Sequence, residues 1–396
     1  MADKHDLVIV GGGIAAVSAA EAFRERDENG SILILSEEDR APYRRTKLSK
    51  RIVDGFETDE LAIYPAEWYE ERRIDLETNR KIVAVDPDAH EVEDADGKRY
   101  AYGKLVLATG GAPVFPGTIP AGETGSFFVL HSARDAERIM KAARKAKKVL
   151  ISGMGVLSVE IAWELHRLGK KITLVGATPQ LMPRQLNLRA AEMLESLLAD
   201  AGVRLHFQEE ILSFERRKKG GYNVSMIRNS GSFDLIILAV GLRPRKELAA
   251  EGGLATATGI RVNRSLRTSN PDIFAAGDAA EHEGGHMTWL WHSAEYQGRI
   301  AGTNAAGGEE EYDFRPFRFR AEVFGSYLFS VNKPRALDMA EMEEFEFENG
   351  SRYRAFYFSD DILSGIVMAN DPDNAKLYEQ AVQERWSLDR AETDLF

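Results

Sequence analysis

The 396-residue sequence contains no cysteine. This absence excludes a disulfide framework, thiolate metal sites and every redox mechanism that passes electrons through a thiol. No apolar run approaches the roughly 18 residues of a membrane span. The first apolar strand begins almost at the first residue, which leaves no room for a signal peptide. We therefore expect a soluble, cytoplasmic protein that does not contact a membrane.

The sequence also lacks an excess of positive charge. Lys and Arg number 51 against 63 Asp and Glu, a formal net charge of −12. An acidic chain of this kind is not expected to bind nucleic acid. Its length is too great for one core of ordinary size and predicts two or three domains.

A phosphate-binding motif stands near the start of the chain. Four apolar residues, 7–10, precede a glycine turn with G-x-G-x-x-A spacing at Gly11, Gly13 and Ala16, and an Ala-rich helix follows. Gly11 permits the sharp turn, and Gly13 lets the backbone approach a pyrophosphate. Ala16 lets the helix pack close to its strand. This passage predicts a dinucleotide site.

The next strand predicts the ribose contact of the same site. Residues 31–36 are predicted as a second strand that ends on Glu37, at roughly the distance where an acidic residue binds the ribose hydroxyls. The alternative is that Glu37 only forms a solvated acidic pair with Glu38. A cationic segment with a turn proline, 41–50, follows and is interpreted either as a pyrophosphate-neutralising loop or as an exposed basic loop.

A second unit of the same kind begins at residue 148. Its strand, 148–152, enters a turn with Gly153 and Gly155 and then a helix, so two nucleotides are expected. Ser158 stands where the motif has its third glycine or alanine. Gly176 stands where an acidic residue would bind the ribose of NADH. No cluster of arginines follows as a clamp for a 2′-phosphate. NADH is slightly favoured, and weak nucleotide binding is the alternative.

Two further strand ends carry candidate ligand contacts. The strand 102–108 ends at Thr109 and Gly110, where a small hydroxyl and a glycine leave room for a ligand. The apolar strand that starts at residue 273 ends in Gly277 and Asp278. Asp278 is interpreted either as a cap of the next helix or as an acceptor for a cofactor hydroxyl.

The last part of the chain changes its pattern. Between the Pro- and Gly-rich segment 112–125 and residue 308 the chain continues as strands and helices, whereas apolar and charged residues alternate after residue 311. This alternation predicts a small antiparallel sheet with one solvated face, completed by a helix over 374–386.

Taken in order, these motifs resemble the FAD-dependent pyridine nucleotide(-disulfide) oxidoreductase superfamily, most closely its NADH:rubredoxin and ferredoxin reductase branch. The resemblance covers essentially the whole chain. It implies an α/β fold with two Rossmann-like domains, the second inserted in the first, and a small α+β C-terminal domain. The expected boundaries are 1–110 and 233–308 for the FAD-binding domain, 111–232 for the NAD(P)H-binding domain and 309–396 for a C-terminal interface or docking domain.

The resemblance also implies roles for individual residues. Thr46 and Lys47 depart from its loop motif P-Y-x-R-x-x-L-S-K, in which they replace the usual prolines. Lys50 and Glu160 are implied to form a catalytic ion pair beside the flavin N5 and the nicotinamide. The expected FAD contacts are Gly11, Gly13, Ala16, Glu37, Arg45, Lys50, Thr109, Gly110, Asp278 and the backbone of Trp291. The expected NAD(P)H contacts are Gly153, Gly155 and Glu160, and no metal site is expected.

The implied activity is transfer of a hydride from NAD(P)H to the flavin. Because there is no cysteine, the electrons would leave the flavin directly for a carrier such as rubredoxin or ferredoxin. An NAD(P)H oxidase or diaphorase that uses oxygen or a quinone is one alternative. A flavin-bearing regulatory or interaction protein with a decayed nicotinamide site is another. A row of arginines, Arg315, Arg318 and Arg320, either docks an acidic carrier or forms a solvated strand face, and a homodimer is possible.

Overall fold

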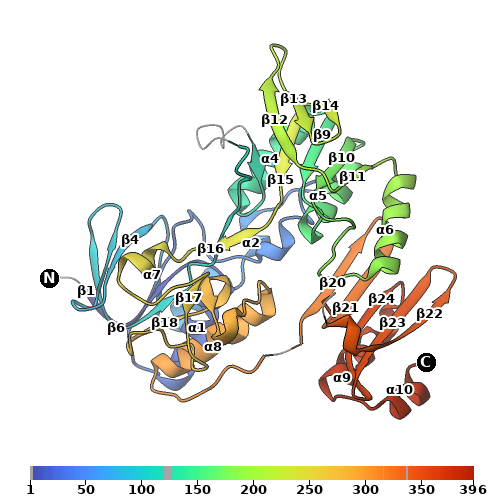
Figure 1. Ribbon diagram of the computed structural model, residues 1–396. Helices are drawn as coiled ribbons and strands as arrows, with labels where there is room; N and C mark the ends of the chain where they lie inside the picture. Colours follow the sequence, from blue (N-terminus) through green and yellow to red (C-terminus); the bar gives the residue numbers. More distant parts are fainter. Residues whose placement is uncertain (1–2, 120–126, 315, 336–337) are drawn as a thin grey trace. The chain divides into compact units, whose positions relative to one another are not determined.

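The computed structural model describes residues 3–119, 127–314, 316–335 and 338–396 (Figure 1). The chain forms two compact units. The first comprises Met1–Lys47, Phe56–Ala112 and Leu242–Phe314, and the second comprises Leu48–Gly55, Pro113–Gly241 and Arg315–Phe396. Residues 120–125 of the Pro- and Gly-rich segment 112–125 lie outside the described part of the chain.

The first unit is built on a seven-stranded sheet in the order β3-β2-β1-β6-β5-β4, with β18 paired to β6. Strands β1, β2, β3, β6 and β18 are parallel, and β4 and β5 form an antiparallel hairpin beside β6. The strand bounds are β1 Asp3–Val10, β2 Ile32–Leu35, β3 Ile74–Glu77, β4 Ile82–Asp86, β5 Glu91–Asp94, β6 Arg99–Leu107 and β18 Ile273–Ala275.

Both faces of this sheet are buried, which explains the continuous apolar run of β1. Leu7 and Ile9 belong to the core on one face, whereas Val8 and Val10 belong to the core on the other. Alternate residues of a strand point to opposite faces, so a strand covered on both sides must be apolar throughout. The helices and short strands of this unit are α1 Ile14–Arg26, α2 Thr58–Leu61, α3 Ala66–Glu71, β7 Gly111–Pro113, β16 Leu242–Pro244, α7 Glu247–Glu251, β17 Ile260–Arg261, β19 Ala280–Glu281 and α8 Trp291–Ala305.

Helices α1 and α8 pack unusually closely. A Cβ atom at Gly298 would lie 2.3 Å from the carbonyl oxygen of Ala15, and one at Gly302 would lie 2.0 Å from that of Ala19. Only glycine permits this approach of two helix backbones. The contact brings the middle of α8 to the start of α1, which follows the first glycine turn.

The second unit contains a parallel sheet in the order β11-β10-β9-β15-β8 and an antiparallel meander β12-β13-β14. The strands are β8 Phe128–Val129, β9 Lys148–Ser152, β10 Lys171–Gly176, β11 Arg204–Phe207, β12 Ile211–Arg216, β13 Tyr222–Met226, β14 Ser230–Phe233 and β15 Leu235–Leu238. The helices are α4 Ala133–Lys145, α5 Val156–Arg167 and α6 Leu188–Asp200. Strand β15 pairs with β9 and belongs to the second unit, and the next segment of the first unit begins at Leu242.

The C-terminal part of the second unit is an antiparallel sheet in the order β20-β21-β24-β23-β22. Alternate residues of β20 are exposed and buried, as the alternating sequence predicts. The elements are β20 Arg318–Val323, β21 Ser326–Val331, β22 Glu343–Asn349, β23 Arg352–Ser359, β24 Ile362–Ala369, α9 Ala375–Gln383 and α10 Leu388–Asp394. Within the described residues, no helix is long and apolar enough to span a membrane.

Candidate active site

The first glycine turn is shaped by two glycines with different constraints. Gly11 has φ +140°, and a Cβ atom there would lie 2.1 Å from the carbonyl oxygen of Ala108. Gly13, the N-cap of α1, has φ −103°, and a Cβ atom there would meet no atom of the described residues within 4 Å. The packing of strand on strand therefore requires Gly11, whereas Gly13 faces open space beside the unpaired N–H groups of the helix start.

The acidic residues after β2 are engaged by different arginines. Glu37 is exposed and forms an ion pair with Arg245. Glu38 is less exposed, pairs with Arg45 and accepts a hydrogen bond of 2.7 Å from the Tyr43 hydroxyl. The two acids are therefore not one solvated pair. The role of Glu37 at the ribose remains a prediction.

Asp278 lies in a short 3₁₀ turn, Gly277–Ala279, at the end of β18. Gln297 of α8 holds this turn by accepting a 2.8 Å hydrogen bond from the Gly277 N–H. Burial raises the pKa of Asp278 to about 6, and the charge of Arg45 opposes this shift. The next α-helix begins at Trp291 with Leu290 as its N-cap. The interpretation of Asp278 as the cap of that helix is therefore wrong.

Thr109 and Trp291 complete the predicted contacts of the first unit. The Thr109 hydroxyl donates a 2.8 Å hydrogen bond to the Arg245 carbonyl oxygen, and Gly110 beside it has φ +67°. Trp291 is half-buried and is the first residue of α8, so its N–H has no partner within the helix. Trp289 precedes it with φ +53°, a strained backbone for a bulky residue that the sequence does not reveal.

The second glycine turn has the same geometry as the first. Gly153 has φ +134°, and a Cβ atom there would lie 2.3 Å from the Ala239 carbonyl oxygen. Gly155 is the N-cap of α5 with φ −84°, and a Cβ atom there would meet nothing within 4 Å among the described residues. The second turn also leaves open space at a helix N-terminus. Ser158 is fully buried, and its hydroxyl has no hydrogen-bond partner in the described part of the chain.

The end of β10 has no acidic side chain at Gly176. A Cβ atom there would lie 2.7 Å from the Met154 side chain. The neighbouring strand β11 ends at Phe207, opposite Gly176 in the register. Arg228 donates to the carbonyl oxygen of Phe207 at 2.7 Å and pairs with the buried Glu209 at 3.5 Å.

Lys50 and Glu160 form an ion pair within the second unit. The Lys50 Nζ lies 3.7 Å from Glu160 Oε1, and the Ser49 hydroxyl donates a 2.5 Å hydrogen bond to Oε2. Burial raises the pKa of Glu160, while the hydrogen bond from Ser49 and the charge of Lys50 lower it. The Glu160 side chain is 12% exposed and that of Lys50 is 56% exposed. The structure therefore brings the two predicted catalytic residues together.

Further contacts near this pair were not predicted from the sequence. Glu164, one turn after Glu160, accepts a 3.1 Å hydrogen bond from the Val53 N–H and pairs with Arg167 at 3.0 Å. Arg167 also pairs with Asp54 at 3.2 Å. Residues 54 and 167 are 113 positions apart, and no local pattern links them.

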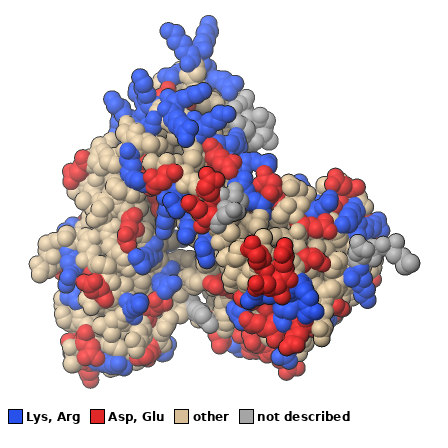
Figure 2. Space-filling view, turned by 180° about the vertical axis from the view of Figure 1, so that it is seen from behind, with Lys and Arg blue, Asp and Glu red and all other residues tan. Residues whose placement is uncertain are grey.

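Positive charge is distributed unevenly over the surface. Arg318 pairs with Glu379 at 2.9 Å and Arg320 pairs with Glu322 at 2.8 Å, so both arginines of the described row have acidic partners. Arg315 lies outside the described residues. Lys and Arg side chains gather instead over the hairpin between β12 and β13 (Figure 2).

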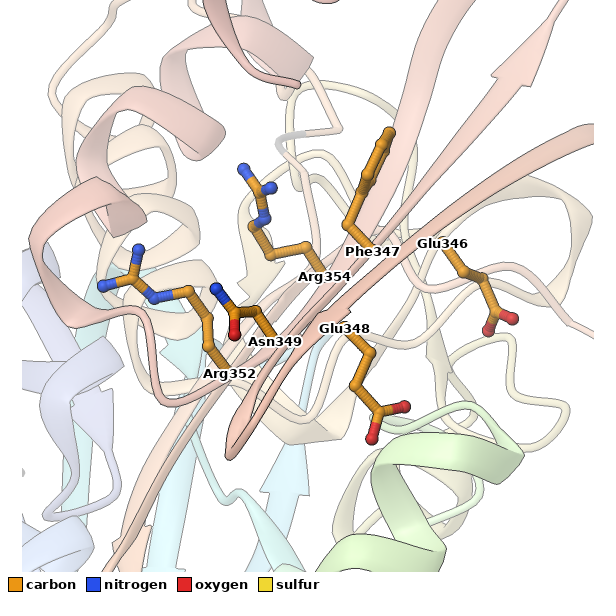
Figure 3. Close-up of a pocket in the computed structure, with 6 residues that line it drawn as sticks. All are labelled: Glu346, Phe347, Glu348, Asn349, Arg352 and Arg354. Carbon is orange, nitrogen blue, oxygen red and sulfur yellow. The ribbon is translucent and has the colours of Figure 1, made fainter.

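A cavity of about 400 Å³ lies at the β22–β23 hairpin of the C-terminal sheet. Phe347, Asn349, Arg352 and Arg354 point to one side of the hairpin, and the glutamates that also line the cavity point to the other (Figure 3). Arg354 donates to the Leu395 carbonyl oxygen at 2.7 Å, and Arg352 lies 3.7 Å from the buried Asp371. The two arginines therefore serve the packing of this sheet.

The chain has two sheets of mainly parallel strands, each with a glycine turn that opens at a helix N-terminus. This arrangement defines the class of proteins that bind two dinucleotides. Residues 5–298 match the family model described as pyridine nucleotide-disulphide oxidoreductase, and the chain belongs to this family. It is an NAD(P)H-dependent flavin oxidoreductase, and family membership implies FAD and NAD(P)H as its cofactors. The resemblance inferred from the motifs and the predicted α/β fold are thus confirmed.

Individual relatives agree with this assignment. The chain is 33% identical over 331 residues to the rubredoxin-NAD(+) reductase of Pseudomonas putida, covering 81% of this chain and 85% of the relative. It is 26% identical over 389 residues to the assimilatory nitrate reductase electron transfer subunit of Bacillus subtilis, covering 96% of this chain but only 50% of that protein. The chain therefore spans about half the length of this second relative.

The fold matches that of solved structures. The reductase in a covalent complex of putidaredoxin reductase with putidaredoxin superimposes with a TM-score of 0.88 at 23% identity. The match covers 97% of this chain and 94% of that one.

Proposed function

We propose that this chain is an NAD(P)H-dependent reductase that passes electrons from its flavin directly to a small rubredoxin- or ferredoxin-type carrier protein. This proposal rests on one combination of features in the same chain: two open glycine turns, the Lys50–Glu160 ion pair and the absence of cysteine. Rubredoxin is the substrate named for the Pseudomonas relative, and putidaredoxin is the bound partner of the solved reductase.

The residues of the first unit fit the ADP and ribityl parts of FAD. Open space beside Gly13 and the N–H groups at the start of α1 suit a pyrophosphate. Asp278 is a partly buried carboxylate whose pKa is raised to about 6 by burial, against the opposing charge of Arg45. A cofactor hydroxyl would donate to it. We therefore assign Gly11, Gly13, Ala16, Glu37, Arg45, Thr109, Gly110, Asp278 and Trp291 to FAD.

We propose NADH as the preferred donor over NADPH. Gly155 leaves open space for the pyrophosphate at the start of α5. A 2′-phosphate requires a cation near the end of β10. Arg228, which lies between β13 and β14 and contacts the end of the neighbouring strand β11, is already held by Glu209 and by the Phe207 carbonyl oxygen. Gly176 offers no carboxylate, so the preference is expected to be small.

The ion pair is proposed to act where hydride leaves the nicotinamide. The flavin, when bound, supplies a hydride acceptor that can release its electrons singly. Burial raises the pKa of Glu160, and the hydrogen bond from Ser49 and the charge of Lys50 oppose this shift by favouring the carboxylate form. In that form Glu160 would stabilise positive charge that develops on a bound nicotinamide ring. Lys50, which is half-exposed, balances the carboxylate when no nucleotide is bound.

An anaerobic titration of the purified holoprotein tests this function. NADH is expected to bleach the visible band of oxidised flavin rapidly, and NADPH more slowly. A reduced carrier of the rubredoxin or ferredoxin type should then appear on mixing, with little consumption of oxygen in its absence. Rapid turnover with oxygen alone would instead identify an oxidase. Flavin that only dithionite can reduce would identify a regulatory protein.

A further inference from the structure

A short segment of the chain, Leu48–Gly55, belongs to the second compact unit although its neighbours in sequence on both sides belong to the first. The segment carries Lys50 and lies along α5. Leu48 and Ile52 are 2% and 1% exposed, so the segment is packed through these two buried side chains. Ser49, Lys50, the Val53 N–H and Asp54 contact side chains of α5.

That face of α5 presents three charged side chains in a row. Glu160, Glu164 and Arg167 follow at spacings of four and three residues, which places them on one side of the helix. Glu160 receives Ser49 and Lys50, as described above. The other two side chains bind the far end of the segment.

The contacts at the far end form a closed chain. Glu164 is 4% exposed. Its Oε2 accepts the Val53 N–H at 3.1 Å, and its Oε1 accepts Arg167 Nη1 at 3.0 Å. Arg167 in turn donates hydrogen bonds to both carboxylate oxygens of Asp54, at 3.3 Å and 3.2 Å. A charge-assisted, bidentate contact of this kind fixes the relative orientation of the two side chains as well as the distance between them.

We propose that Glu164, Arg167 and Asp54 are positioning residues that set the distance between Lys50 and Glu160. This inference rests on the proposed function of the Lys50–Glu160 pair. The 3.7 Å separation of that pair is loose and Lys50 is half-exposed, so the pair does not hold its own geometry. The segment is held instead three and four residues further along, where its backbone and Asp54 are anchored to the same helix.

The first test is Arg167→Leu, with Asp54→Asn as a second variant at the exposed end of the contact chain. We expect flavin reduction by saturating NADH to slow by about tenfold in both, because small misplacements of reacting groups carry costs of this order. The KM for NADH should change less than kcat. Amide hydrogen exchange of the segment 48–55 should become faster in the same variants.

Two further variants separate positioning from fold stability. Arg167→Lys keeps the charge and should recover part of the rate. Arg335→Leu is the matched control, because it breaks an exposed ion pair with Asp338 at 2.9 Å in the same unit, and it should alter neither rate nor exchange. If Arg167→Leu failed to fold, Asp54→Asn alone would decide, because it leaves the Glu164–Arg167 pair intact.

The outcomes distinguish this inference from the function on which it rests. Parental rates and parental exchange in Asp54→Asn, with a slow Glu160→Gln variant, would overturn the positioning role alone. Parental hydride transfer in Glu160→Gln itself would overturn the proposed function of the ion pair. A slow Asp54→Asn with faster exchange of the segment would support both.

Discussion

The hydroxyl of Ser49 donates a hydrogen bond of 2.5 Å to the Glu160 carboxylate, across 111 residues of sequence. This bond lowers the pKa of Glu160 against the opposing effect of burial. Ser49→Ala is therefore expected to raise the pKa of Glu160, because a bond made only to the charged form is lost.

The rate of flavin reduction measured against pH would show the change. The limb that reports ionisation of Glu160 should move to higher pH in Ser49→Ala. Ser49→Thr retains the hydroxyl and serves as the control. An unchanged profile in Ser49→Ala would contradict a role for this bond in keeping Glu160 ionised.

The two glycines of the first turn give a matched pair of variants. Gly13→Ala should fold normally, because its Cβ atom meets only open space, but it should hold FAD weakly. Gly11→Ala should lose about 3 kcal/mol or more of stability, because its Cβ atom would press on the Ala108 carbonyl. Denaturant unfolding and flavin content after purification check the two effects. Full flavin content in Gly13→Ala would argue against a pyrophosphate at this turn.

Asp278 should make the stability of the apoprotein depend on pH. Its folded-state pKa of about 6 lies above the ordinary value of 3.8. Its contribution to stability is therefore fully present below pH 3.8 and is lost as pH rises through 6. At pH 7.5 we expect Asp278→Asn to stabilise the apoprotein by on the order of 1–3 kcal/mol.

Thermal unfolding of both apoproteins at pH 4 and pH 7.5 provides the measurement. The difference between Asp278→Asn and the parent should nearly vanish at pH 4. The same variant should bind FAD more weakly. A variant that is less stable at pH 7.5 would indicate that Asp278 has a structural partner instead.

Nucleotide preference should respond to a carboxylate placed at the end of β10. Gly176→Asp is expected to strengthen binding of NADH relative to NADPH by about tenfold, through a hydrogen bond to the ribose and repulsion of a 2′-phosphate. The Met154 side chain must move to admit the new Cβ atom. Gly176→Ala imposes the same movement without the carboxylate and is the control. Equal effects of the two substitutions would contradict the ribose contact.

Local patterns were sufficient to predict most of the elements. The strand predicted over 148–152 has these same bounds in β9, since an apolar run followed by a glycine turn marks it. Strand β21 was not predicted from the sequence. It joins neighbouring strands through a short turn, and its residues do not alternate between apolar and charged. Helix α10 was also missed.

The candidate site could be predicted only where a motif is continuous in sequence. The two glycine turns are of this kind. The ion pair of Lys50 with Glu160 followed from the family resemblance alone. The anchoring of Asp54 by Arg167 could not be predicted, because charged residues of both signs are common on surfaces and only tertiary packing selects the partners.

The close contact of α1 with α8 has a consequence during synthesis. The helix that follows the first glycine turn must wait for Gly298 and Gly302 to be translated before its outer face is covered. By then every strand of the parallel sheet β11-β10-β9-β15-β8 has already been made. On the ribosome, that later sheet can therefore be completed while the N-terminal helix still exposes apolar surface.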